Sequence, residues 1–417
     1  MLTAARRGAT TASQGPFAVR AINRVGALAQ RGGLAPRLDE QGLLEAASRA
    51  TGLSDFGPDS FRAGLRVLLA SLEAEAHLTT IGRIAARTRI RALLETRLRL
   101  IDHRARHPEV ADEVISRPIF VLGLPRTGTT VLYGMLAADP SMRSPTSWEV
   151  ARPFPPPRPD QRSDDPRIAQ TEKEFDRFRS IAPGIDRIHP LGARLPQECL
   201  ALQAPQLASY EFPTTFSVPS YWAWLREHDL RAAYEFERWF LQHLQSGYGG
   251  AQWILKTPAH LMWLDTLLDV FPDALLVQTH RDPAAVLASV SSLMVAFRSV
   301  MSDHVDHAEV GREQLDAWTW GLARTMRVRD ALPGERVVDV DYRDTVADPI
   351  GTIRRIYAHF GLPVSAEVEG GVRGYLEANP RDKHGAHRYT LEEFGLERDQ
   401  VDDAFAEYRS RFGVGEG

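Results

Sequence analysis

The chain has 417 residues, of which 43% are hydrophobic and 25% are charged, and its formal net charge at pH 7 is −4. This composition is typical of a globular protein with a large core, and the nearly balanced charge gives no indication of general nucleic-acid binding. The single cysteine, Cys199, excludes an intrachain disulfide and a cysteine-rich zinc site, and we therefore expect a reducing, cytoplasmic location. We find no apolar run of about 18 residues, so no transmembrane segment is predicted.

Residues 1–38 form a basic N-terminal segment. They contain several arginines and no acidic residue, and Asp39 is the first carboxylate of the chain. Such a composition resembles a targeting peptide, but no clear amphipathic periodicity supports that interpretation. We therefore predict a disordered tail.

Residues 39–115 are predicted to be a helical region that precedes the main domain. Apolar residues recur in it at spacings of three and four, as in amphipathic helices. Three helices are indicated by Leu43, Leu44 and Ala47, by Leu65, Leu68, Leu69 and Leu72, and by Ile90, Leu93, Leu94, Leu98 and Ile101. The sequence leaves open whether these helices cap the main core or pair subunits in a homodimer.

Residues 116–417 are predicted to form an α/β domain. Short apolar runs without polar alternation indicate strands that are buried on both faces, as in a parallel sheet. These runs lie at 119–122, 253–255, 275–277 and 337–340, and helical segments lie near 129–138, 260–271, 283–298 and 308–331. The alternation of strand and helix favours a central parallel sheet, with a proline-rich loop at 153–167.

A glycine-rich loop, residues 123–130, follows the first of these strands and opens a helix. Gly123 and Gly128 have the spacing of a phosphate-binding P-loop, in which backbone N–H groups and a helix N-terminus converge on an anion. The next residue should be a lysine but is Thr129, which argues against ATP or GTP as the ligand. Arg126 offers a fixed cation for another anion. The alternative is a plain turn between strand and helix.

Two further anchors are predicted at the carboxyl ends of other strands, where ligands of parallel sheets bind. Lys256 follows one strand and is one of only three lysines in the chain. Arg281 follows another strand, and Ser289 lies eight residues later on the next helix. A guanidinium group and a hydroxyl there predict a second anion site, unless Arg281 simply pairs with Asp282.

The order of these three motifs resembles that of sulfotransferases that use 3′-phosphoadenosine-5′-phosphosulfate (PAPS), over roughly residues 117–412. The resemblance implies a P-loop-like three-layer fold with a central parallel sheet, plus the N-terminal helical extension. It also implies transfer of a sulfuryl group from PAPS to a hydroxyl-type acceptor. The nucleotide-binding residues that it implies are Pro125, Arg126, Thr127, Gly128, Thr129, Thr130, Arg281, Ser289, Arg381 and Lys383. For Arg381 and Lys383, a solvated basic loop is an equal competitor.

The reaction needs a base for the acceptor proton, whereas the modest charge of a sulfuryl group makes a metal unnecessary. Glu149 is our first candidate, because some members of the resembled family have a similar glutamate base after the phosphate loop. Its alternative is an ion pair with Arg152. His260 is the second candidate, although it lies four residues after Lys256 and the cytosolic members have their histidine at two. Lys256 would stabilise the charge on the leaving oxygen.

The acceptor is expected to be a small molecule, apolar or lipid-like. An aromatic segment over residues 189–225 could line its pocket or could equally be ordinary core. Asp303, His304, Asp306 and His307 have the composition of metal ligands, but a solvated helix start is favoured, and no metal is predicted. The competing functions are a P-loop kinase that uses ATP and Mg²⁺ and a non-catalytic nucleotide-binding protein.

Overall fold

The computed structural model describes residues 9–10, 17–31, 37–187, 189–380 and 389–415. Its centre is a five-stranded sheet in the order β3-β4-β2-β5-β7, in which all neighbours are parallel. The strands are β2 (Ile119–Gly123), β3 (Met142–Arg143), β4 (Gln252–Lys256), β5 (Leu275–His280) and β7 (Val337–Asp341). The four predicted strands are confirmed, and β3 is an additional short one.

Helices cover both faces of the sheet. Successive strand residues point to opposite faces, so Ile119 and Val121 pack on one side and Phe120 and Leu122 on the other. The first side is covered by α5 (Thr129–Leu136), α16 (Pro349–Phe360) and α17 (Ala366–Ala378). The second side is covered by α11 (Arg231–Gln245), α12 (Leu264–Val270), α13 (Pro283–Met301) and α14 (His307–Arg329). The three-layer α/β prediction is therefore confirmed.

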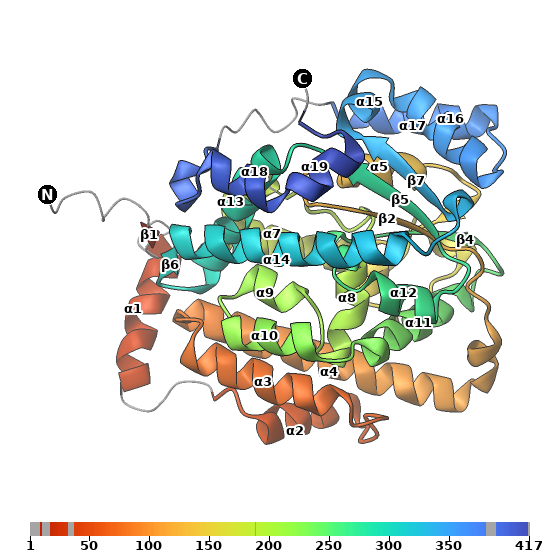
Figure 1. The fold of residues 1–417 in the computed structure, drawn as a ribbon. Coiled ribbons are helices and arrows are strands. Elements are labelled where there is room, and N and C mark those ends of the chain that lie inside the picture. Colours follow the sequence, from red (N-terminus) through yellow and green to blue (C-terminus); the bar gives the residue numbers. More distant parts are fainter. Residues whose placement is uncertain (1–8, 11–16, 32–36, 188, 381–388, 416–417) are drawn as a thin grey trace, which may run out of the picture.

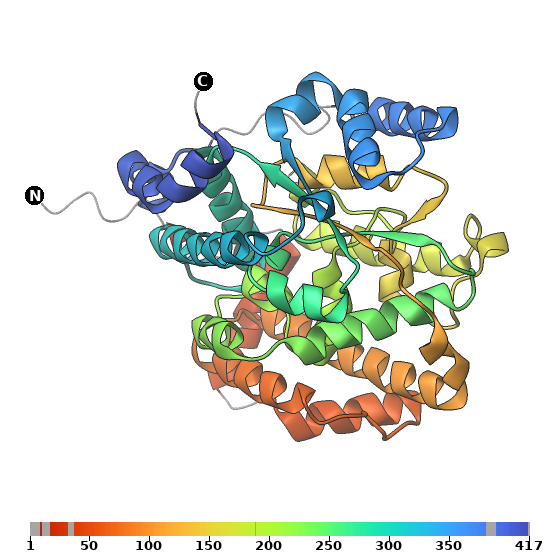
Figure 2. The same ribbon diagram turned by 45° about the vertical axis from the view of Figure 1, so that its right-hand side comes forward.

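Three N-terminal helices extend the second layer. They are α2 (Glu40–Thr51), α3 (Phe61–Ala74) and α4 (Thr80–Arg106). Leu65 and Leu94 belong to the same apolar cluster as Phe120, so these helices cap the main core instead of forming a core of their own. Figures 1 and 2 show α2–α4 along the lower edge and α16 and α17 at the opposite end, with the sheet between them.

Short helices complete the described fold. They are α6 (Ser147–Ala151), α7 (Pro166–Ile181), α8 (Cys199–Gln203), α9 (Glu211–Thr215), α10 (Pro219–Glu227), α15 (Tyr342–Ala347), α18 (Arg398–Ala404) and α19 (Ala406–Phe412). The predicted proline-rich loop lies between α6 and α7 and contains one 3₁₀ turn, Pro159–Gln161. Where we expected a helix from 260 to 271, a 3₁₀ turn at Pro258–Leu261 precedes α12.

The N-terminal segment differs from the expected disordered tail. It contains helix α1 (Phe17–Arg31), which lies against α4, and strand β1 (Ala9–Thr10), which pairs with β6 (Val305–Asp306). The Asn23 side chain accepts a hydrogen bond from the Ile81 backbone N–H (3.0 Å). The segment therefore contains a helix that we did not predict, and this helix is docked on α4.

One helix among the described residues, α13, is long and apolar enough to cross a membrane by length and composition alone. More than half of its apolar window is buried within the protein, against α14 and α9 among others. The hydrophobicity of α13 is therefore explained by its position as a core helix.

Candidate active site

The loop 123–130 has the backbone that its sequence predicted. Gly123 and Gly128 have φ values of 142° and 87°, which L side chains rarely adopt. A Cβ atom on Gly123 would lie 2.4 Å from the Thr279 hydroxyl, so the loop also needs glycine for close packing on β5. Thr127 anchors the loop by donating to the Leu124 carbonyl (2.6 Å), and α5 begins at Thr129. The helix N-terminus therefore opens onto the loop, as an anion site requires.

Arg126, Arg281 and Ser289 converge beside this loop. Arg126 Nε donates to Ser289 Oγ at 3.0 Å, and Arg281 Nη1 donates to the Arg126 carbonyl at 2.8 Å. Arg281 does not pair with Asp282, whose carboxylate caps α13 and contacts Arg398. Partial burial and the neighbouring charge of Arg281 lower the pKa of Arg126. Two cations held this close favour an anion between or beside them.

Lys256, at the end of β4, links the loop to a carboxylate that we did not predict. Its ammonium group donates to Thr130 Oγ1 at 3.2 Å and to Glu198 Oε1 at 2.5 Å. The second oxygen of Glu198 accepts from Thr257 Oγ1 at 3.1 Å. Lys256 is 3% exposed, and the Glu198 side chain is 19% exposed.

Burial disfavours the ionised form of Glu198, but Lys256, the neighbouring His189 and the Thr257 hydroxyl together outweigh it. The pKa of Glu198 is therefore held below its usual value. At neutral pH the residue is a carboxylate that can accept a proton. Its position is fixed by Gln197, whose backbone N–H donates to the Pro145 carbonyl (2.7 Å) and whose carbonyl accepts from the Tyr133 hydroxyl (3.0 Å).

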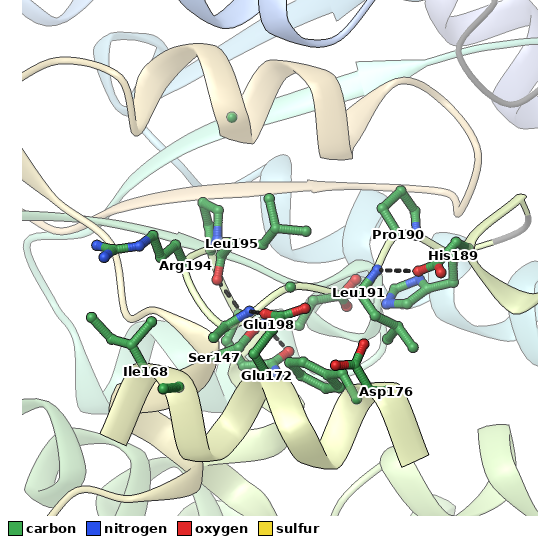
Figure 3. Close-up of a pocket in the computed structure, with 18 of the residues that line it drawn as sticks. Ser147, Ile168, Glu172, Asp176, His189, Pro190, Leu191, Arg194, Leu195 and Glu198 are labelled. Carbon is green, nitrogen blue, oxygen red and sulfur yellow. Dashed lines mark hydrogen bonds between the residues drawn. The ribbon is translucent and has the colours of Figure 1, made fainter. Parts of the chain in front are cut away.

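A cavity of about 1100 Å³ is lined in part by Lys256 and Glu198. Helix α7 and the segment 189–198 line it, as Figure 3 shows, and residues of α5 and α17 line it as well. The segment is tied to α7 because Ala193 N–H donates to Glu172 (2.9 Å) and Arg179 donates to the Leu191 carbonyl (2.7 Å). The apolar part of the lining comes from Ile168, Phe175, Pro190, Leu191, Leu195 and Pro196. This cavity can hold an apolar molecule with a polar group at its inner end.

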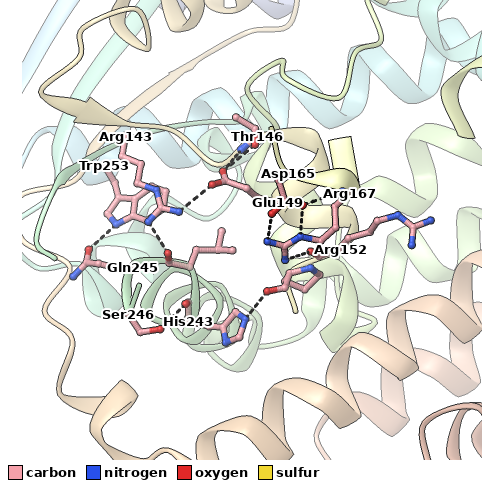
Figure 4. Close-up of polar contacts among 12 residues, drawn as sticks. Arg143, Thr146, Glu149, Arg152, Asp165, Arg167, His243, Gln245, Ser246 and Trp253 are labelled. Atoms are coloured by element: carbon pink, nitrogen blue, oxygen red, sulfur yellow. Dashed lines mark hydrogen bonds and ion pairs between the residues drawn. The ribbon is translucent and has the colours of Figure 1, made fainter. Parts of the chain in front are cut away.

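Glu149, our first candidate for the base, does not line this cavity. It is fully buried, accepts from the Thr146 backbone and hydroxyl (both 2.9 Å) and pairs with Arg143 at 3.1 Å (Figure 4). With Thr146 it forms the capping box at the start of α6. Glu149 therefore caps α6 and lies away from the cavity in the structure, which does not favour it as the base. The expected pair with Arg152 is also absent, because Arg152 pairs with Glu174.

We predict that Glu149→Gln destabilises the protein without removing its chemistry. The change leaves Arg143 buried without its counter-charge, which costs about 3–5 kcal/mol in comparable buried pairs. Chemical denaturation should show the lower free energy of unfolding, whereas the folded fraction should keep its turnover. A variant as stable as the wild type would contradict the structural role.

His260 is also placed away from the cavity. Its ring is fully buried, lies edge-on to Phe120 and has Nδ1 3.0 Å from the Tyr234 hydroxyl. Burial lowers the pKa of His260 to about 3, which makes the imidazole a weak base, and the ring does not line the cavity. The structure therefore places His260 as a core residue, away from the space for the acceptor.

The structure describes two other groups of predicted residues. Within the segment 189–225, Tyr210, Phe212, Phe216 and Tyr221 are buried in the main cluster and none of them lines the large cavity, whereas residues 189–198 at its start do line it. Asp306 caps α14 by accepting from two backbone N–H groups, which is the helix start that we favoured over a metal site. Arg381 and Lys383 lie outside the described residues.

Glu198 is the site residue that the sequence did not assign. It lies 58 residues before Lys256, at the start of the short helix α8, and has no motif around it. The one usable signal is its position shortly before the aromatic residues that begin at Tyr210, and that position indicates no particular chemistry. Only the fold brings it to the end of β4.

The comparisons with known proteins agree with this geometry. A model of the sulfotransferase family matches residues 118–366, which is more than half of the chain. The chain belongs to the sulfotransferase family. This sulfotransferase is an enzyme that transfers a sulfuryl group to a hydroxyl-type acceptor, and the kinase and non-catalytic alternatives are not favoured.

Relatives of the sulfotransferase include proteins of known sequence and of known structure. Stf3 of Mycobacterium bovis and of Mycobacterium tuberculosis, an omega-hydroxy-beta-dihydromenaquinone-9 sulfotransferase, is 28% identical over 322 residues, which are 73% of this chain and 77% of Stf3. The crystal structure of STF1 from M. tuberculosis H37Rv has a TM-score of 0.80 and 34% identity, covering 88% of this chain and 98% of STF1. That of STF9 from Mycobacterium avium has a TM-score of 0.83 and 31% identity, covering 90% and 96%.

Proposed function

We propose that this enzyme takes its sulfuryl group from PAPS and transfers it to the hydroxyl of an apolar, lipid-like acceptor in the cytoplasm, with Glu198 as the general base. The observation that carries the proposal is the contact of Lys256 with both Thr130 of the phosphate loop and Glu198 of the cavity. This contact connects the anion-binding loop to a carboxylate that lines the cavity for the acceptor.

The binding of PAPS is supported by the loop and by the two arginines beside it. PAPS is a general substrate of the family. The backbone of residues 123–130 and the N-terminus of α5 suit its 5′-phosphosulfate group, and Arg281 with Ser289 suits its 3′-phosphate. A kinase would need a lysine where Thr129 stands.

The chemistry forms a bond between the acceptor oxygen and sulfur while the bond between sulfur and the phosphate oxygen breaks. Glu198 takes the proton of the acceptor hydroxyl, and Lys256 stabilises the negative charge on the departing phosphate oxygen. The same ammonium that depresses the pKa of Glu198 is attracted to the anionic sulfate donor. When Lys256 also contacts the sulfate donor, it stabilises the Glu198 carboxylate less. Glu198 is then a stronger base at the step in which it takes the acceptor proton.

The acceptor class follows from the cavity and from one relative. The cavity is lined by apolar side chains such as Phe175, Leu191 and Leu195 together with charged ones, and Glu198 and Lys256 are among its lining residues. Stf3 is named for a hydroxylated menaquinone. We therefore propose a hydroxylated quinone or another apolar alcohol as acceptor, with the hydroxyl at Glu198.

The decisive experiment is an acceptor screen with radiolabelled PAPS. Hydroxylated quinones and long-chain alcohols should become labelled, whereas sugars and other polar alcohols should not. Thermal-shift measurements should show stabilisation by 3′,5′-adenosine bisphosphate and none by ATP with Mg²⁺. Stabilisation by ATP with Mg²⁺ alone, without sulfate transfer, would overturn the proposal.

Removing Arg281 should mainly weaken nucleotide binding. Arg281→Ala loses a charged hydrogen bond to phosphate, worth about 1.5–3 kcal/mol, so the Kd should rise about 10- to 150-fold. Calorimetry with 3′,5′-adenosine bisphosphate measures this change, and 5′-adenosine monophosphate is the matched control, since its affinity should fall much less. An unchanged Kd would remove Arg281 from the nucleotide site.

A further inference from the structure

Helix α1 exposes a stripe of large apolar side chains. Phe17, Ile22, Val25 and Leu28 are 79%, 48%, 69% and 67% exposed, and they make up half of the large hydrophobic residues found exposed in the described part of the chain. We call these four side chains the α1 stripe. Scattered exposed hydrophobic residues are ordinary, but four on one 15-residue helix mark an interaction surface.

The α1 stripe faces away from the protein. At about 100° per residue, its four members lie on one side of the helix, and Asn23 and Gly26 lie on the other. Asn23 is bound to the backbone of α4, and a Cβ atom on Gly26 would lie 2.0 Å from Thr80 Oγ1. The helix is therefore fixed to α4 through its polar and small residues, while its apolar side remains uncovered in the described fold.

The charge of the N-terminal segment complements an anionic surface. Residues 1–37 contain six arginines and no acidic residue. Since the whole chain has 50 basic and 54 acidic residues, the remainder carries an excess of ten acidic ones. Arg20 and Arg24 are exposed on α1, on the side of the helix adjoining Phe17 and Leu28.

We propose that α1 docks this enzyme onto the surface of an anionic lipid bilayer, with the α1 stripe inserted among the lipids and the arginines at the headgroups. A helix with one apolar side and arginines beside it is the usual form of an interfacial anchor. At 15 residues, α1 is too short to span a bilayer, which takes about 20. The proposal concerns a surface away from the active site and does not depend on the identity of the acceptor.

The size of the α1 stripe favours a membrane over a second protein. A standard protein interface buries about 800 Å² on each partner, through 20–30 residues. Four side chains on one short helix supply much less than that by themselves. A bilayer needs no matched shape, and every apolar group that enters it contributes to binding.

The test is co-sedimentation of the full chain with vesicles. The wild type should bind vesicles containing 30% phosphatidylglycerol at least about tenfold better than pure phosphatidylcholine vesicles, because each surface arginine contributes about 1 kcal/mol on anionic lipid. The combined variant Phe17→Ser, Val25→Ser and Leu28→Ser should lose at least about 90% of this binding, since the α1 stripe supplies the apolar insertion. Val114→Ser, which removes another exposed apolar side chain, should bind like the wild type.

A labelling experiment keeps the proposal testable if the triple variant folds poorly. Cys199 is fully buried, so an environment-sensitive dye should label Leu28→Cys at the new thiol only. Its emission should shift to the blue on addition of the anionic vesicles, whereas a dye at Val364→Cys should not respond. Equal vesicle binding by the triple variant, no binding by the wild type, or a dimer in light scattering that the triple variant abolishes would each overturn the proposal.

Discussion

Glu198→Gln should lower kcat about 100- to 10,000-fold, the usual contribution of a general base. The amide keeps the size of the side chain and its contact with Thr257, but it cannot take the acceptor proton. Because Glu198 lies on the cavity side of Lys256, the Kd for 3′,5′-adenosine bisphosphate should change little. Single-turnover assays with radiolabelled PAPS measure the first quantity, and calorimetry measures the second.

Glu149→Gln is the matched control for this experiment. It makes the same chemical change at a carboxylate that caps α6 and pairs with Arg143. The two variants should fail in opposite ways: the change at Glu198 removes turnover from a stable protein, and the change at Glu149 removes stability from an active one. If Glu198→Gln turned over like the wild type, the base would have to be sought elsewhere along the cavity.

Lys256→Met is the second change with a large expected effect. Methionine fills a similar volume but supplies no charge to the departing phosphate oxygen, and the loss of one such donor lowers kcat about 100- to 1,000-fold. The variant should still fold, because Lys256 lies at the end of β4 and its main polar contacts are within the site. Wild-type kcat in this variant would exclude a catalytic role for the ammonium group.

The same variant should shift the pH dependence in a defined direction. Ionised Glu198 is the active form, and its depressed pKa keeps wild-type activity present into mildly acidic solution. Without Lys256, the burial of Glu198 is no longer outweighed, and its pKa must rise. The acidic limb of the kcat/KM profile should therefore move to higher pH, so that residual activity falls away sooner on acidification. A limb that stays in place would show that another group titrates in the wild type.

The donor side of the site was readable from the sequence because it is built from local patterns. A buried strand followed by Gly123–Gly128 and a helix determines its own backbone, since only glycine tolerates these φ values and the N–H groups of a helix start need an anion or a cap. The positions of Lys256 and Arg281 followed in the same way from strand ends. In a parallel sheet the carboxyl ends of the strands lie at one edge, irrespective of how the rest of the chain folds.

The base was different, because the sequence did not show which of two glutamates faces the site. Glu149 lies three residues after Thr146, and this spacing is itself a capping signal that we read as chemistry. Glu198 has no such local signal. It reaches the site only because Tyr133 and Pro145 hold Gln197 in place and because the fold brings it to Lys256, which lies 58 residues further along the chain.

The sequence by itself therefore determined the fold class, the phosphate loop and the strand-end cations, all of which depend on residues close together in the chain. Only the tertiary structure decided which carboxylate contacts the lysine. It also decided that the buried aromatic side chains are core, and that α1 is docked with its apolar side outward. These depend on long-range packing, and neither periodicity nor residue type encodes which distant surfaces come into contact.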